Sequence, residues 1–184
     1  MRRVALGVNW QGAFDVHAAI AEAKAADAAG VDLITVAEAW GRDAFTTMTL
    51  LAYETKNIHI GTSIINIFSR TPAALAQNFT TLDSLSGGRM VIGLGTSGPQ
   101  VIEHFHGMPF KMPVTRMRET IEIINSLVAG IPLHYHGKVF TLDRGFTLRD
   151  YQPTATRNHI PIFVGAQGPV SVKMTAEVAD GWLP

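Results

Sequence analysis

Short apolar runs alternate along this chain with longer segments in which apolar residues recur at helical spacing. Five runs rich in valine, isoleucine and leucine are followed by the beginning of a sixth at Trp182 and Leu183. The five runs are residues 4–8, 33–36, 58–64, 90–94 and 160–164. Because parallel strands that are covered on both faces are apolar along their length, the pattern predicts a parallel sheet assembled from strand–helix units.

Capping residues mark where the intervening helices begin and end. Asp43 is a candidate N-cap, and Thr71 followed by Pro72 is typical of an N-cap and a first helical residue. Gly30 and the pair Gly87–Gly88 are expected just after helix C-termini, where a left-handed conformation favours glycine. Helices are therefore predicted over about residues 14–29, 43–56, 71–86, 115–129 and 171–180.

The repeat is interrupted at residues 131–159, where alternating polar and apolar residues predict an inserted β-hairpin after the fourth helix. Elsewhere the strands begin 25 to 32 residues apart, close to one βα unit each. Two α/β architectures share this repeat. One is a doubly wound open sheet of the flavodoxin type, and the other is an incomplete (β/α)8 TIM barrel of about five and a half βα units. Periodicity alone leaves both open, and residues 1–184 are expected to form a single domain.

Polar or glycine residues follow every predicted strand. Ligands bind at the carboxyl ends of the strands in both architectures, so these residues are expected to share one rim. They are Asn9 and Trp10 after the first strand, Glu38 and Trp40 after the second, Thr62, Ser63 and Asn66 after the third, Thr96 and Ser97 after the fourth, and Gly165, Gln167 and Gly168 after the fifth. The sequence therefore predicts a binding site on this rim.

Two glycine-rich turns are candidates for contact with that ligand. Residues 93–98 match the pattern GxGxxG, but a loop is expected at 99–106 and no acidic residue ends a strand about 20 residues later. We therefore interpret these glycines as admitting a flat ligand, with Thr96 and Ser97 as donors. Residues 165–169 lead directly into a helix, whose free N–H groups and dipole favour a phosphate.

Composition and charge narrow the function classes. The 184 residues include 15 lysines and arginines, 15 aspartates and glutamates, and no cysteine. Neither nucleic acid nor an anionic membrane is an expected partner, and thiolate sites are excluded. His104 and His106 have no evident third ligand, so no metal site is expected. No apolar run suits an export signal or a membrane span, which predicts a cytoplasmic protein. The charges within residues 116–122 are interpreted as an ion-pair face of one helix.

Several segments also carry a resemblance to a known family. They are residues 36–45, 60–64, 68–72, 85–89 and 93–101, with 165–169 and 179–182 in addition. These segments resemble the luciferase-like monooxygenase family, and more narrowly its branch of oxidoreductases that depend on the 5-deazaflavin coenzyme F420. The resemblance covers essentially the whole chain. The family fold is a (β/α)8 barrel with an insertion, so the resemblance implies the first half to two-thirds of such a barrel.

The resemblance implies roles for the rim residues. The Ser63–Ile64 bond matches the place of a non-proline cis peptide that bulges behind the ring of the cofactor. Glu38 matches an acidic position near the reacting face and is expected to donate a proton or to orient the substrate. Many relatives carry histidine where this chain has Ala39, which leaves Trp40 as a candidate to stack on the ligand or line the pocket. The remaining expected cofactor contacts are Thr96 and Ser97 beside the ring, Gly165, Gln167 and Gly168 at the phosphate, and Asn9.

The activity implied by the resemblance is hydride transfer between coenzyme F420 and a small organic substrate. An FMN-dependent monooxygenase on the same fold is the alternative within the enzyme class. The other alternative is an incomplete, non-catalytic chain that binds a flavin. An open parallel sheet leaves two unpaired edges that favour self-association, so a homo-oligomer is expected.

Overall fold

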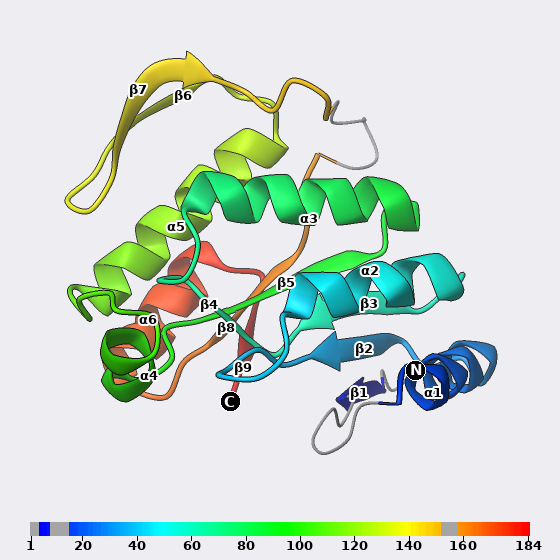
Figure 1. Cartoon of the computed structure of the whole chain (residues 1–184). Coiled ribbons are helices and arrows are strands. Elements are labelled where there is room, and N and C mark those ends of the chain that lie inside the picture. Colours follow the sequence, from blue (N-terminus) through cyan, green and yellow to red (C-terminus); the bar gives the residue numbers. More distant parts are fainter. Residues whose placement is uncertain (1–3, 8–14, 152–157) are drawn as a thin grey trace.

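The computed structural model describes residues 4–7, 15–151 and 158–184, in which a curled parallel sheet is lined by helices (Figure 1). The strands of this sheet are β1 (Ala5–Gly7), β2 (Leu33–Val36), β3 (His59–Thr62), β4 (Ile65–Asn66), β5 (Met90–Gly95), β8 (Ile162–Gly165) and β9 (Gly181–Leu183). They are parallel in the order β1-β2-β3-β5-β8-β9, and β4 pairs with β5. Each predicted apolar run therefore contributes a strand.

The strands lie in the sheet in the order in which they occur along the chain. A doubly wound sheet instead reverses its order at a switch point. β1 and β9 lie at opposite ends of this order and are not paired with each other in the described part of the chain. The fold is therefore an incomplete (β/α)8 barrel. This order excludes the flavodoxin-type alternative and agrees with the rejection of a dinucleotide fingerprint at residues 93–98.

Two helices begin directly after the N-caps that the sequence predicts, Asp43 and Thr71. The helices in the described residues are α1 (Val16–Ala28), α2 (Ala44–Glu54), α3 (Pro72–Ser86), α4 (Pro99–His104), α5 (Pro113–Val128) and α6 (Pro169–Val178). The Asp43 carboxylate accepts a hydrogen bond from the Thr46 amide at 2.6 Å, and the Thr71 hydroxyl caps α3 in the same way. Gly87 ends α3 with a φ of 70°. Within the described residues, no helix is long and apolar enough to cross a bilayer.

The prediction of a loop at residues 99–106 is wrong, because the short helix α4 begins at Pro99, directly after Gly98. Proline at the first helical position fixes a helical φ and lacks the N–H that a helix start leaves unpaired, so it favours this beginning. His106 follows the helix, and its Nε2 lies 3.3 Å from Nδ2 of Asn66. Among the described residues, no group of three potential metal ligands gathers here or elsewhere.

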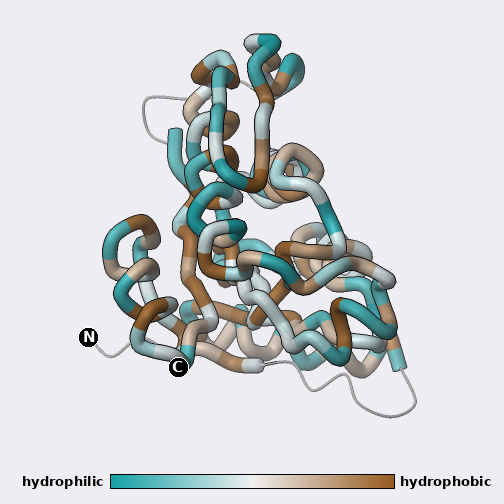
Figure 2. The backbone as a smooth tube through the Cα atoms, turned by 90° about the vertical axis from the view of Figure 1, so that its left-hand side faces the viewer, coloured by the Kyte–Doolittle hydropathy of each residue, from teal (hydrophilic) through white to brown (hydrophobic). Residues whose placement is uncertain are grey.

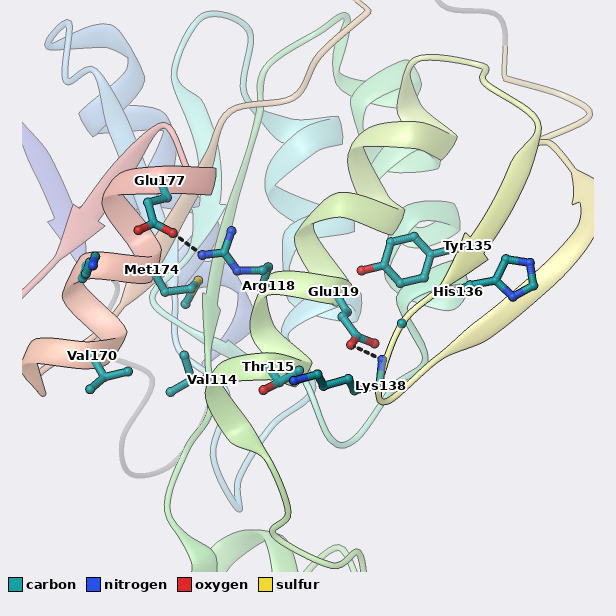
Figure 3. Close-up of a pocket in the computed structure, with 12 residues that line it drawn as sticks. Val114, Thr115, Arg118, Glu119, Tyr135, His136, Lys138, Val170, Met174 and Glu177 are labelled. Atoms are coloured by element: carbon teal, nitrogen blue, oxygen red, sulfur yellow. Dashed lines mark hydrogen bonds and ion pairs between the residues drawn. The ribbon is translucent and has the colours of Figure 1, made fainter.

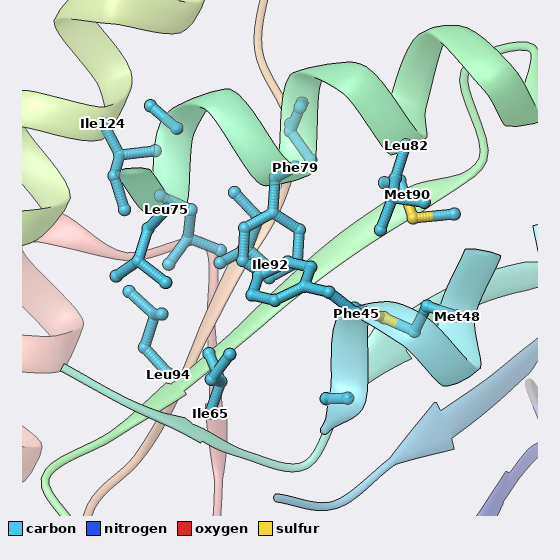
Figure 4. Close-up of a cluster of buried hydrophobic side chains, with 14 of the residues drawn as sticks. Phe45, Met48, Ile65, Leu75, Phe79, Leu82, Met90, Ile92, Leu94 and Ile124 are labelled. Carbon is cyan, nitrogen blue, oxygen red and sulfur yellow. The ribbon is translucent and has the colours of Figure 1, made fainter. Parts of the chain in front are cut away.

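The core fills the space between the sheet and helices α2, α3 and α5 (Figure 4). Phe79 of α3 is fully buried, and its ring meets the Phe45 ring of α2 edge-on with 5.0 Å between centroids. Ile92 and Leu94 of β5 are fully buried in the same cluster. Burial of these apolar surfaces is the main source of stability and holds the helices against the strands.

Arg89 ties the amino-terminal end of β5 to the ends of α2 and α3. The residue is only 9% exposed. Its guanidinium donates five hydrogen bonds of 2.7 to 3.0 Å, to the carbonyls of Ala52, Thr55, Ile58 and Ser86 and to the Thr55 hydroxyl. All of its donors are thus satisfied by neutral oxygens. This cluster lies at the end of the sheet opposite the carboxyl ends of the strands, where residues support the fold.

Asp27, near the end of α1, organises the loop before β3. Its carboxylate accepts hydrogen bonds from three consecutive amides, those of Lys56 at 2.7 Å, Asn57 at 3.0 Å and Ile58 at 2.8 Å. Burial raises the pKa of Asp27, but these hydrogen bonds outweigh it and hold the pKa below its usual value. The ionised carboxylate is therefore the form that stabilises this loop.

Strands β6 (Leu133–His136) and β7 (Thr141–Phe146) form an antiparallel hairpin. The hairpin projects beyond the helices at one end of the molecule (Figure 2). It is anchored on α5 by Glu119, whose buried carboxylate accepts hydrogen bonds of 2.6 to 3.2 Å from the amides of residues 138–140. The turn of the hairpin is therefore held against the helix.

A second contact between α5 and the hairpin is made by Arg116. Its guanidinium lies over the rings of Phe68 and Phe140, at 4.8 and 5.0 Å from their centroids. The interpretation of residues 116–122 as an ion-pair face is therefore wrong for Arg116 and Glu119, which bind the hairpin instead. It holds for Arg118 and Glu122, which make an i,i+4 contact of 4.0 Å.

Candidate functional site

A cavity of about 790 Å³ opens at the carboxyl ends of β3, β5 and β8. The predicted rim residues in its wall are Ser63, Ile64, Thr96, Ser97, Gly165, Gln167 and Gly168. Val114 and Met117 of α5 and Met174 of α6 also line the cavity. Sequence reasoning missed these three residues, because an apolar residue on a helix is the usual sign of an ordinary core position.

The chain bulges between β3 and β4, where the sequence predicts one unbroken strand over residues 58–64. The Ser63–Ile64 peptide bond is cis, as the resemblance implies. β3 pairs with only the first part of β5, and pairing with β5 resumes in β4. Thr62 spans the gap, because its hydroxyl donates to the Gly93 carbonyl at 2.7 Å and accepts from the Gly93 amide at 3.0 Å. The bulge thus replaces a regular stretch of the sheet.

The Ile64 side chain lies over two glycines at neighbouring strand ends. A Cβ atom at Gly95 would be 2.5 Å from Ile64 Cδ1, and one at Gly165 would be 3.2 Å from Ile64 Cγ2. A Cβ at Gly93 would be 1.7 Å from the Thr62 carbonyl oxygen. The interpretation that residues 93–98 admit a flat ligand is therefore wrong for Gly93, because protein atoms already fill the space beside it, whereas Gly95 lines the cavity next to Ile64.

The other polar parts of the wall are two turns. Ser97 has a positive φ of 55°, and its carbonyl accepts a hydrogen bond from the Thr96 hydroxyl at 3.2 Å. Gly168 is the N-cap of α6, and no described side chain caps this helix start. The Ser171 hydroxyl instead donates back to the Gly168 carbonyl at 2.8 Å. The first-turn amides of α6 thus remain suited to an anionic ligand group.

Glu38 is engaged by the protein itself. Its side chain is 8% exposed, and its two oxygens accept hydrogen bonds from Arg70 at 2.6 and 3.1 Å. One of these oxygens also accepts from the Ala44 amide at 2.9 Å. Arg70 binds Asp43 as well. Burial raises the pKa of Asp43, but hydrogen bonds from Thr46 and the charge of Arg70 outweigh it, so the pKa lies below its usual value.

Two predicted site residues stand apart from the cavity wall. Glu38 and Trp40 are not among the described residues that line it, and Trp40 is 70% exposed. Asn9 lies outside the described residues. Sequence reasoning did not single out Arg70, although it lies within residues 68–72. Its place directly before the helix N-cap at Thr71 is the signal that could have drawn attention to it.

The sequence of the chain matches the model of one known protein family. A family model described as luciferase-like monooxygenase matches residues 3–184. The chain belongs to the luciferase-like monooxygenase family. The parallel barrel strands and the motifs that carry the resemblance agree with this family, and the cavity lies at the carboxyl ends of the strands, where (β/α)8 barrels bind their ligands.

Two curated relatives narrow the comparison within the luciferase-like family. The provisionally named coenzyme F420-dependent oxidoreductase Rv3520c of Mycobacterium tuberculosis is 41% identical over 172 residues, covering 87% of this chain and 48% of the relative. The 5,10-methylenetetrahydromethanopterin reductase of Archaeoglobus fulgidus is 34% identical over 161 residues, covering 87% and 46%. The chain thus spans about half the length of these relatives.

A solved structure shows the same fold. The coenzyme F420-dependent tetrahydromethanopterin reductase from Methanopyrus kandleri matches with a TM-score of 0.80 and 28% identity, covering 97% of this chain and 54% of that chain. The curled sheet of the luciferase-like chain therefore corresponds to roughly half of a complete barrel.

Proposed function

We propose that this luciferase-like protein is an oxidoreductase that transfers a hydride between coenzyme F420 and a small organic substrate. The observation that carries the proposal is the cavity in which the Ser63–Ile64 bulge faces the start of α6 across the ends of β5 and β8. The relatives named as F420-dependent support this choice of cofactor.

The cavity fits such a cofactor in size and in chemistry. A volume of about 790 Å³ lies within the range of roughly 300–1,000 Å³ typical of small-molecule sites. Ile64 and Met117 supply apolar surface for a flat ring, and Thr96 and Ser97 supply polar groups. When bound there, the deazaflavin supplies a ring carbon that accepts or gives a hydride.

The residues of the wall would divide between the two ends of the cofactor. Ile64 would support one face of the ring from the bulge, and Thr96 and Ser97 would lie along its edge. Gly165, Gln167 and Gly168 would surround the phosphate, which the amides and the dipole of α6 favour at the helix start. The chain thus orients the ring while the helix start attracts the charged group.

Of the two roles expected for Glu38, proton donation and orientation of the substrate, we assign it the second. Hydrogen bonds from Arg70 and from the Ala44 amide already occupy both of its carboxylate oxygens. Its backbone N–H donates to the Ile64 carbonyl at 3.2 Å, which connects it to the bulge. Asn9 and Trp40 stay predicted contacts, for the cofactor and the substrate respectively.

A binding titration tests the proposal. Purified protein is titrated with coenzyme F420 and, separately, with FMN, and fluorescence quenching is followed. We expect saturable binding of F420 that is lost in Thr96→Trp, which fills the cavity, and retained in Thr141→Trp on the exposed hairpin. Preferential FMN binding with oxygen consumption would support a monooxygenase instead. FMN binding without oxygen consumption would support the non-catalytic alternative, and failure to bind either cofactor would contradict the proposal.

A further inference from the structure

Residues 179–182, which carry part of the resemblance, span the start of β9 and do not line the candidate cofactor cavity. Within them, Asp180 fixes the register of β9 against β8. Its amide donates to the Ile162 carbonyl at 2.9 Å, and its carboxylate accepts from the Ile162 amide at 2.7 Å. His159 Nε2 lies 2.9 Å from both oxygens of the same carboxylate. The starts of the two strands are therefore tied together.

Gly181 lets β9 pack closely on β8. It pairs with Phe163, and a Cβ atom at Gly181 would lie 2.3 Å from Cε1 of the Phe163 ring. No side chain therefore fits at this position unless the ring moves. Further along the pairing, Trp182 lies opposite Val164, next to the turn formed by residues 165–168.

The Trp182 side chain holds this turn. Its indole Nε1 donates to the Ala166 carbonyl at 2.6 Å, and the Ala166 amide donates to the Leu183 carbonyl at 3.4 Å. Both backbone polar groups of Ala166 are therefore engaged by β9. The Trp182 ring is half exposed, so it contributes less apolar burial than a core aromatic residue does.

The hydrogen bond from Trp182 fixes the direction of the next amide. The Ala166–Gln167 peptide is trans, because the one cis bond in the described residues is Ser63–Ile64. In a planar trans peptide the C=O and the N–H point in opposite directions, so the Gln167 N–H points away from Trp182. Gln167 lines the cavity and Trp182 does not. No described residue accepts a hydrogen bond from the Gln167 amide, which is therefore available to a ligand.

We infer that Trp182 is a positioning residue for the phosphate of the cofactor, an inference that rests on the proposed function. By holding the Ala166 carbonyl on the β9 side, Trp182 keeps the Gln167 N–H turned toward the phosphate at the start of α6. An amide that donates to a charged oxygen stabilises the bound phosphate, whereas a carbonyl oxygen in its place repels it. Trp182 thus acts through the turn and does not touch the cofactor.

The test compares two deazaflavins on the same protein. One is coenzyme F420, and the other carries a hydroxyl in place of the phosphate. Their dissociation constants are measured by quenching of the deazaflavin fluorescence, for the wild type and for Trp182→Phe, which keeps an aromatic ring and removes the N–H donor. A second variant carries benzothienylalanine at position 182, which keeps the shape of the indole and replaces its N–H with sulfur.

Tyr135→Phe is the matched control. It also keeps an aromatic ring and removes one donor, because the Tyr135 hydroxyl donates to Glu122 at 2.5 Å. Figure 3 shows Tyr135 beside the hairpin and Met174 on α6, with α5 between them. The control therefore loses a hydrogen bond away from the turn at residues 165–168. Thermal melting verifies that the variants fold.

We expect both variants at position 182 to bind coenzyme F420 roughly tenfold more weakly, which corresponds to about 1.4 kcal/mol. Their affinity for the hydroxyl form is expected to equal that of the wild type, and the control is expected to bind both forms like the wild type. Equal weakening for both forms, no weakening for either, or weakening in Trp182→Phe alone overturns the positioning role while the proposed function stands. If the wild type binds neither form, the proposed function fails and the role of Trp182 fails with it.

Discussion

The Arg70 guanidinium binds both carboxylate oxygens of Glu38, with 2.6 Å from Nη1 to Oε1 and 3.1 Å from Nη2 to Oε2. This pair ties the loop after β4 to the end of β2. The backbone amide of Glu38 donates to the Ile64 carbonyl, so the pair lies directly beside the bulge. One backbone hydrogen bond therefore connects Ile64 in the cavity wall to an ion pair outside that wall.

Replacing Arg70 by methionine is expected to destabilise the protein by about 3 kcal/mol, because the Glu38 carboxylate then stays buried without its cation. Urea unfolding measures the loss. The double variant Arg70→Met/Glu38→Gln is expected to recover part of it, since no unpaired charge remains. Strictly additive losses in the double variant would contradict a coupled pair.

Gly95→Ala is expected to abolish most cofactor binding, because the new methyl group pushes the Ile64 side chain away from β5. Ile64→Ala/Gly95→Ala removes that clash and should restore stability toward the value of Ile64→Ala alone. Cofactor titration and thermal melting check both variants. Normal binding by Gly95→Ala would show that Ile64 can move without altering the cavity.

The Asp27 carboxylate is expected to make stability depend on pH in acid. Its folded pKa lies below the ordinary value of 3.8, so its contribution is complete above that value and is lost as the pH falls through the folded pKa. Asp27→Asn should cost about 1–2 kcal/mol at pH 7 and progressively less in acid. Urea midpoints across the pH range measure this. Asp143→Asn, at an exposed hairpin position, serves as the control. A loss of stability in Asp27→Asn that does not change with pH would refute the assignment of this pH dependence to Asp27.

Arg89→Lys is expected to cost about 3 kcal/mol, although the charge is kept. A lysine has three donors on one nitrogen and cannot reach all the acceptors that the planar guanidinium spans. Urea unfolding should show the loss, while the cofactor dissociation constant stays near that of the wild type under folding conditions. A variant with wild-type stability would mean that water replaces these hydrogen bonds.

Some of the site was visible in the sequence because its residues follow apolar strands. Parallel strand ends share one edge of a sheet, so Thr96, Ser97 and the residues around Gly165 could be placed together without coordinates. The apolar contribution of Met117 and Met174 could not be foreseen in this way. Whether such a side chain faces a cavity or the core depends on how two helices pack.

The sequence by itself determined the local structure of this protein: its strands, its helix caps and its βα repeat. These features depend on neighbouring residues, whose hydropathy pattern and capping groups can be read along the chain. Only the tertiary structure decided that the strands follow chain order, that Ile64 fills the space over Gly95, and that Arg70 pairs with Glu38. The physical reason is that such contacts join residues about thirty positions apart, and their packing and charge pairing arise only when the curled sheet brings them together.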